Sequence, residues 1–288
     1  MDILNIVIQG ILLGGLYALF ATGLSLMFGV MRIVNLAHGD LAIVAAYLAL
    51  VFVAQGFLPV WLVVLITVPL FGLVGYVVQR GLFGRSLKSG PLATLLVTFG
   101  LSVVIQNGLQ QAFSADTKTI DAGWLTTAAW HVNSQLSISY LSLLTLVLAL
   151  GAIVGIQLFL TRSGLGRMMR ASSDDPQIAA VVGGDSRHIY GIATAIAFAT
   201  VALAGLMFAM RSSFDPSLGP SRLLFAFEAV VIGGLGSLWG TLLGGAVLGL
   251  TQTLVAFVDP SWSILAGHLV FLAVLAFRPQ GLIPRRSI

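Results

Sequence analysis

The sequence contains no cysteine among its 288 residues. This absence excludes a disulfide framework, a thiolate nucleophile and a cysteine-based metal site. Charged side chains are also scarce: they make up 8% of the residues, compared with about 25% in a typical soluble domain, whereas 58% of the residues are hydrophobic. Because a soluble fold cannot bury so much apolar surface, the composition predicts an integral membrane protein.

Signatures of nucleotide and metal binding are missing as well. The two lysines, Lys88 and Lys118, do not follow a glycine, so the chain has no GxxxxGK[ST] phosphate-binding loop. The four histidines are scattered and form no HxxxH pair. If the chain moves a solute uphill, we therefore expect an ATPase on another chain or an ion gradient to supply the energy. The net charge of +4 does not indicate nucleic-acid binding, because basic residues of membrane proteins gather in cytoplasmic loops.

Long apolar runs divide the chain into helices that can cross a bilayer core of about 30 Å. The runs predict spans at 3–31, 41–54, 59–79, 91–113, 136–160 and 189–210, and three shorter segments between 223 and 277. The predicted fold class is therefore all-α: a polytopic integral membrane protein with about eight or nine transmembrane helices, some short or broken, in one transmembrane domain covering 1–288. The polar stretch 114–135 between two spans is expected to be a solvated connector rather than a binding site.

The positions of the basic residues predict the orientation. Three regions carry most of them, and nine crossings would place all three on the same side: Arg80, Arg85 and Lys88; Arg162, Arg167, Arg170 and Arg187; Arg278, Arg285 and Arg286. The positive-inside rule then predicts a cytoplasmic C-terminus and an N-terminus outside. Lys118, Arg211 and Arg222 do not follow this pattern.

The loop at 162–188 contains a short helix with signals at both ends. Asp175 is a favourable N-cap, Pro176 is suited to the first helical position, and Gly183-Gly184 is a typical C-terminal stop. Ser172, Ser173 and Asp174 are expected to crowd the same helix start. Between these signals, PQIAAVV gives the helix an apolar face outside the membrane. That face needs a partner, which can be the bilayer surface, the chain's own spans or another protein.

The stretch NLAHGD at 35–40 places polar side chains next to a short span. The run 41–54 is about 21 Å long as a helix, which is less than the hydrocarbon thickness. We therefore expect 35–40 to enter the membrane, with a break at Gly39. Such a segment is buried in protein or lines a cavity. The candidate pathway-lining residues are Asn35, His38, Gly39, Asp40 and, in a later segment, Glu228; alternatively, the polar groups near the break only satisfy freed backbone groups, or His38 and Asp40 serve a metal or proton relay.

Small residues recur at four-residue spacing near the C-terminus. Gly236, Gly240 and Gly244 form one row, which predicts close packing between helices in lipid. GILLGG at 10–15 is similar to GTLLGG at 240–245 and hints at two related halves.

Four stretches, in this order, carry a resemblance to a known family: GVMRIVNLAHGDLAIVAAYLAL (29–50), SGLGRMMRASSDDPQIAAVVGGD (163–185), FEAVVIGGLGSLWGTLLGG (227–245) and FRPQGLI (277–283). Together they resemble the permease subunits of branched-chain amino acid ABC importers of the LivH type. The resemblance implies a bacterial inner-membrane permease domain that binds no cofactor itself and works with a second homologous permease, two cytoplasmic ATPases that hold ATP and Mg, and a periplasmic substrate-binding protein. It also implies that the short helix of the 162–188 loop is a coupling helix in a groove of the ATPase, carried by Asp174, Asp175, Pro176, Ala179, Ala180, Val182 and Gly183.

The sequence leaves alternatives open for the transported substrate and for the class of protein. The same pattern occurs in permeases for other amino acids, urea or short amides, and the binding protein sets much of that choice. A second class is an ion-driven carrier or channel in which His38, Asp40 and Glu228 relay charge. A third class, an intramembrane enzyme, lacks a paired carboxylate or a Ser–His arrangement. We expect a transport subunit, without a metal site, and no enzyme.

Overall fold

The computed structural model describes residues 3–54, 56, 58–131, 137–181 and 183–283. Seven helical segments in these ranges are long and apolar enough to cross a membrane, and a shorter apolar helix covers His38–Val53. The seven segments are formed by α1 (Ile3–Met31), α3 (Val60–Val78) with the turns after it, α5 (Pro91–Phe113), α7 (Tyr140–Arg162), α10 (Ser186–Arg211), α12 (Leu238–Val258), and α13 (Ser263–Phe277) with the turn at 260–262 before it. The predicted all-α polytopic membrane fold is confirmed.

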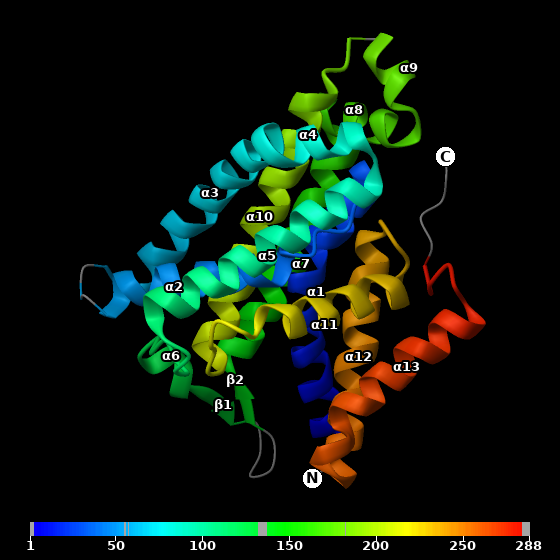
Figure 1. The fold of residues 1–288 in the computed structure, drawn as a ribbon. Helices are drawn as coiled ribbons and strands as arrows, with labels where there is room; N and C mark the ends of the chain where they lie inside the picture. Colours follow the sequence, from blue (N-terminus) through cyan, green and yellow to red (C-terminus); the bar gives the residue numbers. More distant parts are fainter. Residues whose placement is uncertain (1–2, 55, 57, 132–136, 182, 284–288) are drawn as a thin grey trace.

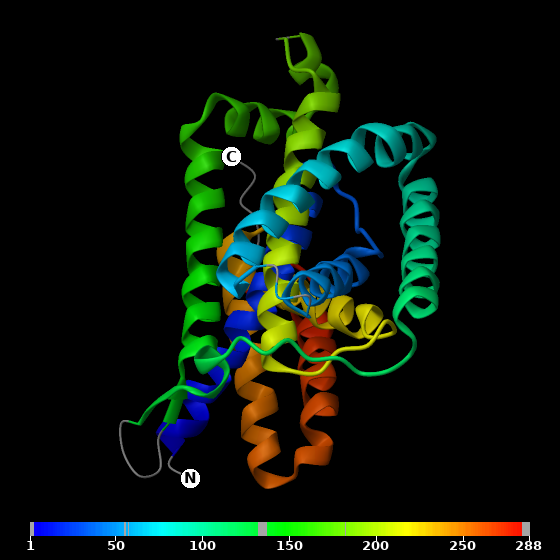
Figure 2. The same ribbon diagram turned by 90° about the vertical axis from the view of Figure 1, so that its left-hand side faces the viewer.

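Two short helices, α2 (His38–Ala54) and α11 (Gly219–Gly233), lie across the direction of the long ones. Both run sideways in Figure 1 and are seen nearly end-on in Figure 2, whereas α7 and α10 stand upright. They correspond to the runs whose length predicted short or broken spans. Neither is long enough to cross a bilayer core of about 30 Å by itself.

Small elements connect the long helices at the two ends of the molecule. At one end, α3 continues into the π-helical turn η1 (Gln79–Phe83), α4 (Gly84–Ser86) and η2 (Leu87–Ser89), and α7 continues into α8 (Gly164–Asp174) and α9 (Pro176–Val181). We call this the α9 end; Figure 1 shows α9 projecting beyond every span there. At the opposite end lie α6 (Trp124–Thr127), the antiparallel strands β1 (Ala129–His131) and β2 (Ser137–Ser139), and η3 (Pro260–Trp262). The predicted connector 114–135 is strapped to α10 there, since Ile120 N donates to Ala209 O at 3.2 Å.

The order of elements repeats along the chain in opposite directions. A long helix, a short transverse helix and two long helices follow one another as α1, α2, α3, α5 and again as α10, α11, α12, α13. Helix α1 ends at the α9 end with Met31-Arg32, whereas α10 starts there and ends with Met210-Arg211 at the opposite end. Inverted repeats of this kind are common in transporters.

The similar stretches GILLGG and GTLLGG are two sides of one helix contact rather than equivalent parts of these repeats. A Cβ atom built on Gly14 would lie 2.6 Å from Ala246 Cα, and one built on Gly245 would lie 2.6 Å from Gly14 O. Helices α1 and α12 therefore approach until their backbones touch. Close approach gains the van der Waals contact that holds helices together in lipid.

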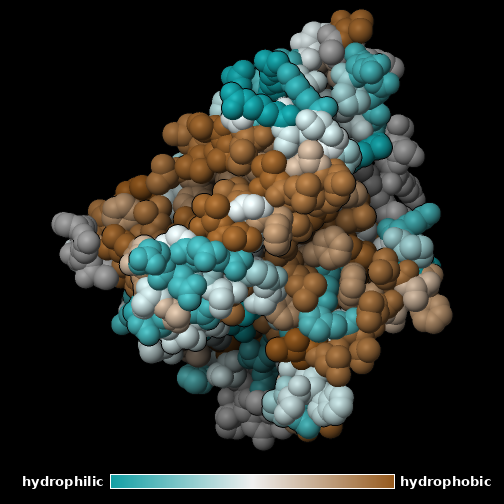
Figure 3. Space-filling view, in the orientation of Figure 1, coloured by the Kyte–Doolittle hydropathy of each residue, from teal (hydrophilic) through white to brown (hydrophobic). Residues whose placement is uncertain are grey.

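The spans differ strongly in burial. Within their most apolar windows, α10 is 72% and α1 61% buried, but α5 is 17% and the segment of α13 only 6% buried. Helices α1 and α10 are thus the core, and the outer helices present apolar faces to lipid or to another subunit. Figure 3 shows the resulting hydrophobic belt over α3 and α5.

We expect Gly14→Ala to lower stability by about 1–3 kcal/mol, because the added methyl group would overlap α12. Thermal unfolding of the purified protein in detergent measures the loss. Gly108→Ala on α5 is the matched control, since a Cβ there has no neighbour within 4 Å. Equal unfolding temperatures for the two variants would contradict the proposed tight contact of α1 and α12.

Candidate functional site

The stretch 35–40 turns back into the bundle after α1. His38 Nε2 lies 2.9 Å from Phe20 O. Phe20 precedes the last residue of α1 by eleven positions, which is about 16 Å of helix. Helix α2 therefore starts deep inside the helix bundle, as the short run after NLAHGD predicted. We call 35–40 and the first turns of α2 and α11 the re-entrant site.

At the re-entrant site the starts of α2 and α11 touch, although they are 180 positions apart in the sequence. A Cβ on Gly39 would overlap Gly219 O, and a Cβ on Gly219 would overlap the Asp40 carboxylate. A glycine is needed at both positions because no side chain fits between the two backbones. The contact fixes one inverted repeat against the other.

Asn35 and His38 are fully buried and both bond to the backbone, Asn35 within the non-helical stretch 32–37 and His38 to the middle of α1. Asn35 Oδ1 accepts from Ala37 N at 3.0 Å. His38 Nε2 carries a proton, because the carbonyl of Phe20 can only accept. Its Nδ1 has no hydrogen-bond partner among the described residues. The ring packs on Gly23, where a Cβ would lie 3.0 Å from Cε1.

Asp40 starts a chain of hydrogen bonds that leads outwards. Its Oδ2 accepts from Ser102 Oγ at 2.6 Å, and Ser102 Oγ accepts from Gln106 Nε2 at 3.0 Å. Gln106 borders a polar cavity of about 290 Å³ near the end of α5, which is also lined by Asn107, Gln110, Ala115, Asp215, Pro216 and Ser217. The Asp40 carboxylate, which is 1% exposed, is thereby connected to this polar cavity.

Glu228 lies elsewhere on α11, nine positions or about 14 Å of helix from Gly219. Its side chain is buried, and its Oε1 lies 2.5 Å from His268 Nδ1 on α13. The His268 ring stacks on Phe225 at 5.9 Å. The structure thus brings Asn35, His38, Gly39 and Asp40 together but separates Glu228 from them. In this conformation these side chains are enclosed within the chain, and their role in a pathway stays a prediction.

A second buried cluster of polar side chains, between α1, α10, α11 and α12, was not predicted from the sequence. Tyr17 OH donates to Gln252 Oε1 at 2.5 Å, and the Arg222 guanidinium lies 4.3 Å from the centre of the Phe208 ring. Arg211 Nη1 and Arg222 Nε are buried without a hydrogen-bond partner in the described ranges. The available signal was that Arg211 and Arg222 depart from the charge bias of the loops.

The predicted short helix of the 162–188 loop is α9. Gln177 N donates to Asp175 Oδ1 at 2.8 Å, so Asp175 caps the helix start as expected, and Pro176 is its first residue. Gly184 N donates to Ala179 O at 2.8 Å, and Gly183 has a φ of +89°. Ala179 is buried, whereas Val181 is 88% exposed. Val182 and the side chain of Ala180 lie outside the described residues.

The serines before α9 belong to α8, a helix that the sequence analysis did not predict. The expectation that Ser172, Ser173 and Asp174 surround the start of the short helix is therefore wrong: they form the last turn of α8. Ser173 Oγ donates to Gly29 O on α1 at 2.6 Å. Ser172 Oγ donates to Tyr190 OH on α10 at 3.4 Å. Helix α8 is thus joined to both core helices.

The three glycines of the predicted packing row have different positions. Gly236 lies in the turn before α12 with a φ of +79°, and Gly29 packs on it. Gly240 and Gly244 lie on α12 against α11, where a Cβ on Gly244 would meet Gly233 N at 2.8 Å. Helix α12 therefore has two glycine faces: Gly240 and Gly244 pack against α11, and Gly245 and Gly249 pack against α1. Within the described ranges, no group of three or more His, Asp or Glu side chains could hold a metal ion.

The sequence was compared with known proteins. The family described as branched-chain amino acid transport system, permease component, matches residues 6–275. The permease BraD of the high-affinity branched-chain amino acid transport system of Pseudomonas aeruginosa is 30% identical over 300 residues, which cover 98% of this chain and 95% of BraD. LivH of Escherichia coli is 25% identical over 97% of this chain and 95% of LivH, and LivM of the same bacterium is 33% identical over 43% of this chain and 30% of LivM. No solved structure matches.

These matches confirm the resemblance drawn from the four sequence stretches, because they span nearly the whole chain and not one motif. They agree with an all-α chain whose apolar helices form a polytopic membrane protein. The chain belongs to the family of permease components of branched-chain amino acid transport systems, and it is a transport subunit rather than an enzyme.

Proposed function

We propose that this chain lies in a bacterial inner membrane and, with a second homologous permease, forms the translocation pathway of an ATP-driven importer of branched-chain amino acids. Two ATPase subunits bind at the α9 end, and a periplasmic substrate-binding protein docks at the opposite end. The observation that carries the proposal is α9, a capped helix beyond the spans with an exposed apolar residue. Similarity to both LivH and LivM supports a pair of related permeases.

The distribution of basic residues supports a cytoplasmic α9 end. Basic side chains border this end in the connections after α1, α3 and α7 and at the start of α10: Arg32, Arg80, Arg85, Lys88, Arg162, Arg167, Arg170 and Arg187. Of the three charges that departed from the pattern, Lys118 and Arg211 lie at the opposite end, where Lys118 pairs with Phe214, and Arg222 lies in the first turn of α11. By the positive-inside rule the α9 end faces the cytoplasm.

The contacts of α8 explain how movement of an ATPase would reach the pathway. Helix α9 is the outermost element, and α8 beneath it is tied to α1 through Ser173 and to α10 through Ser172. Helices α1 and α10 are the buried core, and each leads into a short helix of the re-entrant site. A displacement of α9 is therefore passed to both inverted repeats at once.

We propose that the pathway follows the polar surface of α5 and that the buried re-entrant residues shape it from behind. Asn107 and Gln110 are exposed at the half of α5 away from the α9 end. Amides in contact with lipid tails are unfavourable, so this surface needs water or a second subunit. Asp40 reaches it only through Ser102 and Gln106. Asn35, His38, Gly39 and Glu228 then set the positions of α2 and α11.

The central test is reconstitution. We expect ATP-dependent uptake of leucine, isoleucine or valine into proteoliposomes that contain this chain, its partner permease, the ATPases and the binding protein. Urea and acetamide, offered to the same complex, should give no uptake. Uptake by this chain alone under an ion gradient without ATPase would instead support a carrier, the alternative class.

Val181 offers the sharpest test of the coupling role. Val181→Asp should insert normally but reduce uptake by tenfold or more, because an unpaired charge buried at an interface costs about 2–5 kcal/mol. Val181→Thr keeps the shape without the charge and is the matched control, expected to remain active. Ala179 is a poorer probe, because it is buried and its substitution would also disturb folding.

ATPase pull-down and uptake are measured on the same Val181 preparations. If Val181→Asp retains both the ATPase and full uptake, α9 is not the coupling helix.

Asp40 separates a shaping role from a charge-relay role. Asp40→Asn keeps an acceptor for Ser102 and should retain uptake within about threefold, whereas Asp40→Ala leaves the Ser102 hydroxyl without its acceptor and should destabilise by about 1–3 kcal/mol. Uptake and unfolding temperature are measured for both variants. A stable Asp40→Asn protein without any uptake would mean that the charge itself takes part in transport.

A further inference from the structure

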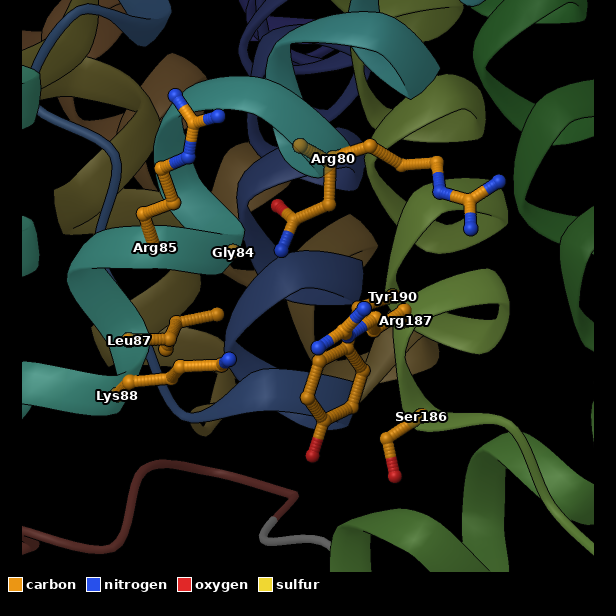
Figure 4. Close-up of a pocket in the computed structure, with 9 residues that line it drawn as sticks. Arg80, Gly84, Arg85, Leu87, Lys88, Ser186, Arg187 and Tyr190 are labelled. Carbon is orange, nitrogen blue, oxygen red and sulfur yellow. The ribbon is translucent and has the colours of Figure 1, made fainter.

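A basic cavity lies at the α9 end, between the turns that follow α3 and the first turns of α10 (Figure 4). Its volume is about 530 Å³, and its lining residues are Gln79, Arg80, Gly84, Arg85, Leu87, Lys88, Ser186, Arg187 and Tyr190. The transport proposal above makes no use of this cavity.

The charge of the cavity is not compensated. Four of its nine lining residues are cationic and none is acidic, and the four form no ion pair in the described part of the chain. Arg80 donates one hydrogen bond, to Tyr76 OH at 3.2 Å. The acid next to the cavity, Asp185, accepts from Arg187 N at 3.0 Å and offsets at most one of the four positive charges. The cavity therefore keeps a net positive charge, which suits an anionic ligand.

Two of the four cations face each other across the cavity. In Figure 4, Lys88 extends from one wall toward Tyr190 and Arg187 on the other wall, whereas the guanidinium groups of Arg80 and Arg85 point away from Lys88. The first turn of α10, whose start is capped by Asp185, contributes Ser186, Arg187 and Tyr190 to the lining. Guanidinium and ammonium groups donate to phosphate oxygens without accepting, and arginine does so in a bidentate manner.

The surroundings select a lipid as the source of that phosphate. Below the cavity, the neighbouring spans expose large apolar side chains, Val77 on α3 and Leu92 and Leu96 on α5. These spans are only about a fifth buried within the chain, and Figure 3 shows hydrophilic surface bordering their hydrophobic belt toward the α9 end. A ligand with an anionic head and apolar tails would match both surfaces. Helix α9 projects beyond this level, so a protein bound there stands farther from the membrane (Figures 1 and 2).

We propose that this cavity binds the headgroup of an anionic phospholipid and that the bound phosphate bridges the turn after α3 to the start of α10. The two walls already meet deeper in the protein, where Thr194 Oγ1 donates to Gln79 Oε1 at 2.8 Å. A headgroup would close the outer half of this contact. Since α10 directly follows the α9 segment, the lipid would stiffen the element that receives the movement of α9.

Native mass spectrometry of the purified chain, given equal amounts of phosphatidylglycerol and phosphatidylethanolamine, tests the proposal. The wild type should retain phosphatidylglycerol preferentially. Lys88→Gln with Arg187→Gln, one change on each wall, should weaken this retention by about twenty-five-fold, because each cation that contacts the phosphate contributes about fivefold. The two single variants show the effect separately if the double variant is poorly folded, and unfolding temperature in neutral detergent monitors folding.

The matched control is Arg162→Gln with Arg167→Gln, which removes the same charge at the same end but outside the cavity. It should change retention by less than about threefold, because neither side chain lines the cavity and charges farther from the phosphate are screened. Equal losses in both double variants would overturn the site in favour of general surface attraction. Retention of inorganic phosphate without any preference for phosphatidylglycerol would replace the lipid by a soluble anion. Unchanged lipid retention with loss of the ATPase subunit would make the cavity a protein contact.

Discussion

The structure depends on one constraint, that backbone entering a membrane protein away from a regular helix must find its hydrogen bonds inside the chain. The segment 32–37 returns about 16 Å along α1 before α2 begins at His38. Asn35 supplies one such partner, to Ala37 N, His38 fixes the segment to α1 through Phe20 O, and glycines at 39 and 219 allow α2 and α11 to touch. In this conformation the polar side chains of 35–40 thus bond to groups of the chain itself.

The helices around the re-entrant site fall into a tightly packed centre and an exposed periphery. Helix α12 touches α1 and α11 through glycines on two of its faces, and α1 and α10 are the most buried spans. In contrast, the segments of α3, α5, α7 and α13 are only 6–22% buried within the chain. The centre of the chain is therefore tightly packed, and its outer helix faces need lipid or another subunit to cover them. Lipid suffices for the apolar sides, but the amides of α5 need water or a second permease.

Element bounds could be predicted where charges, proline or glycine delimit an apolar run. The ends of α1 next to Arg32 and the start of α5 at Pro91 were found for this reason, and the short α2 revealed its own depth through its length. Helix α8 was missed because its buried stripe, Gly166, Met169, Ser172 and Ser173, has a single large apolar side chain, Met169, and the serines find their partners on α1 and α10. The pairs of Asp40 with Ser102 and of Glu228 with His268 join residues 62 and 40 positions apart. No local pattern specifies such pairs, since they follow from how the helices cross.

The contact between Gly39 and Gly219 also sets a schedule for biosynthesis. Ribosomes add about 5–20 residues per second, so Gly219 emerges roughly 10–40 s after Gly39. During that time α2, which is too short to cross the bilayer alone, lacks its contact with α11. The Asp40 carboxylate first gains its hydrogen bond from Ser102 and only later its contact with Gly219. The first inverted repeat is therefore held in the membrane in an unfinished form until the second is made. A nascent chain that stops before α11 lacks the helix that covers the start of α2, and its first repeat stays open at that place.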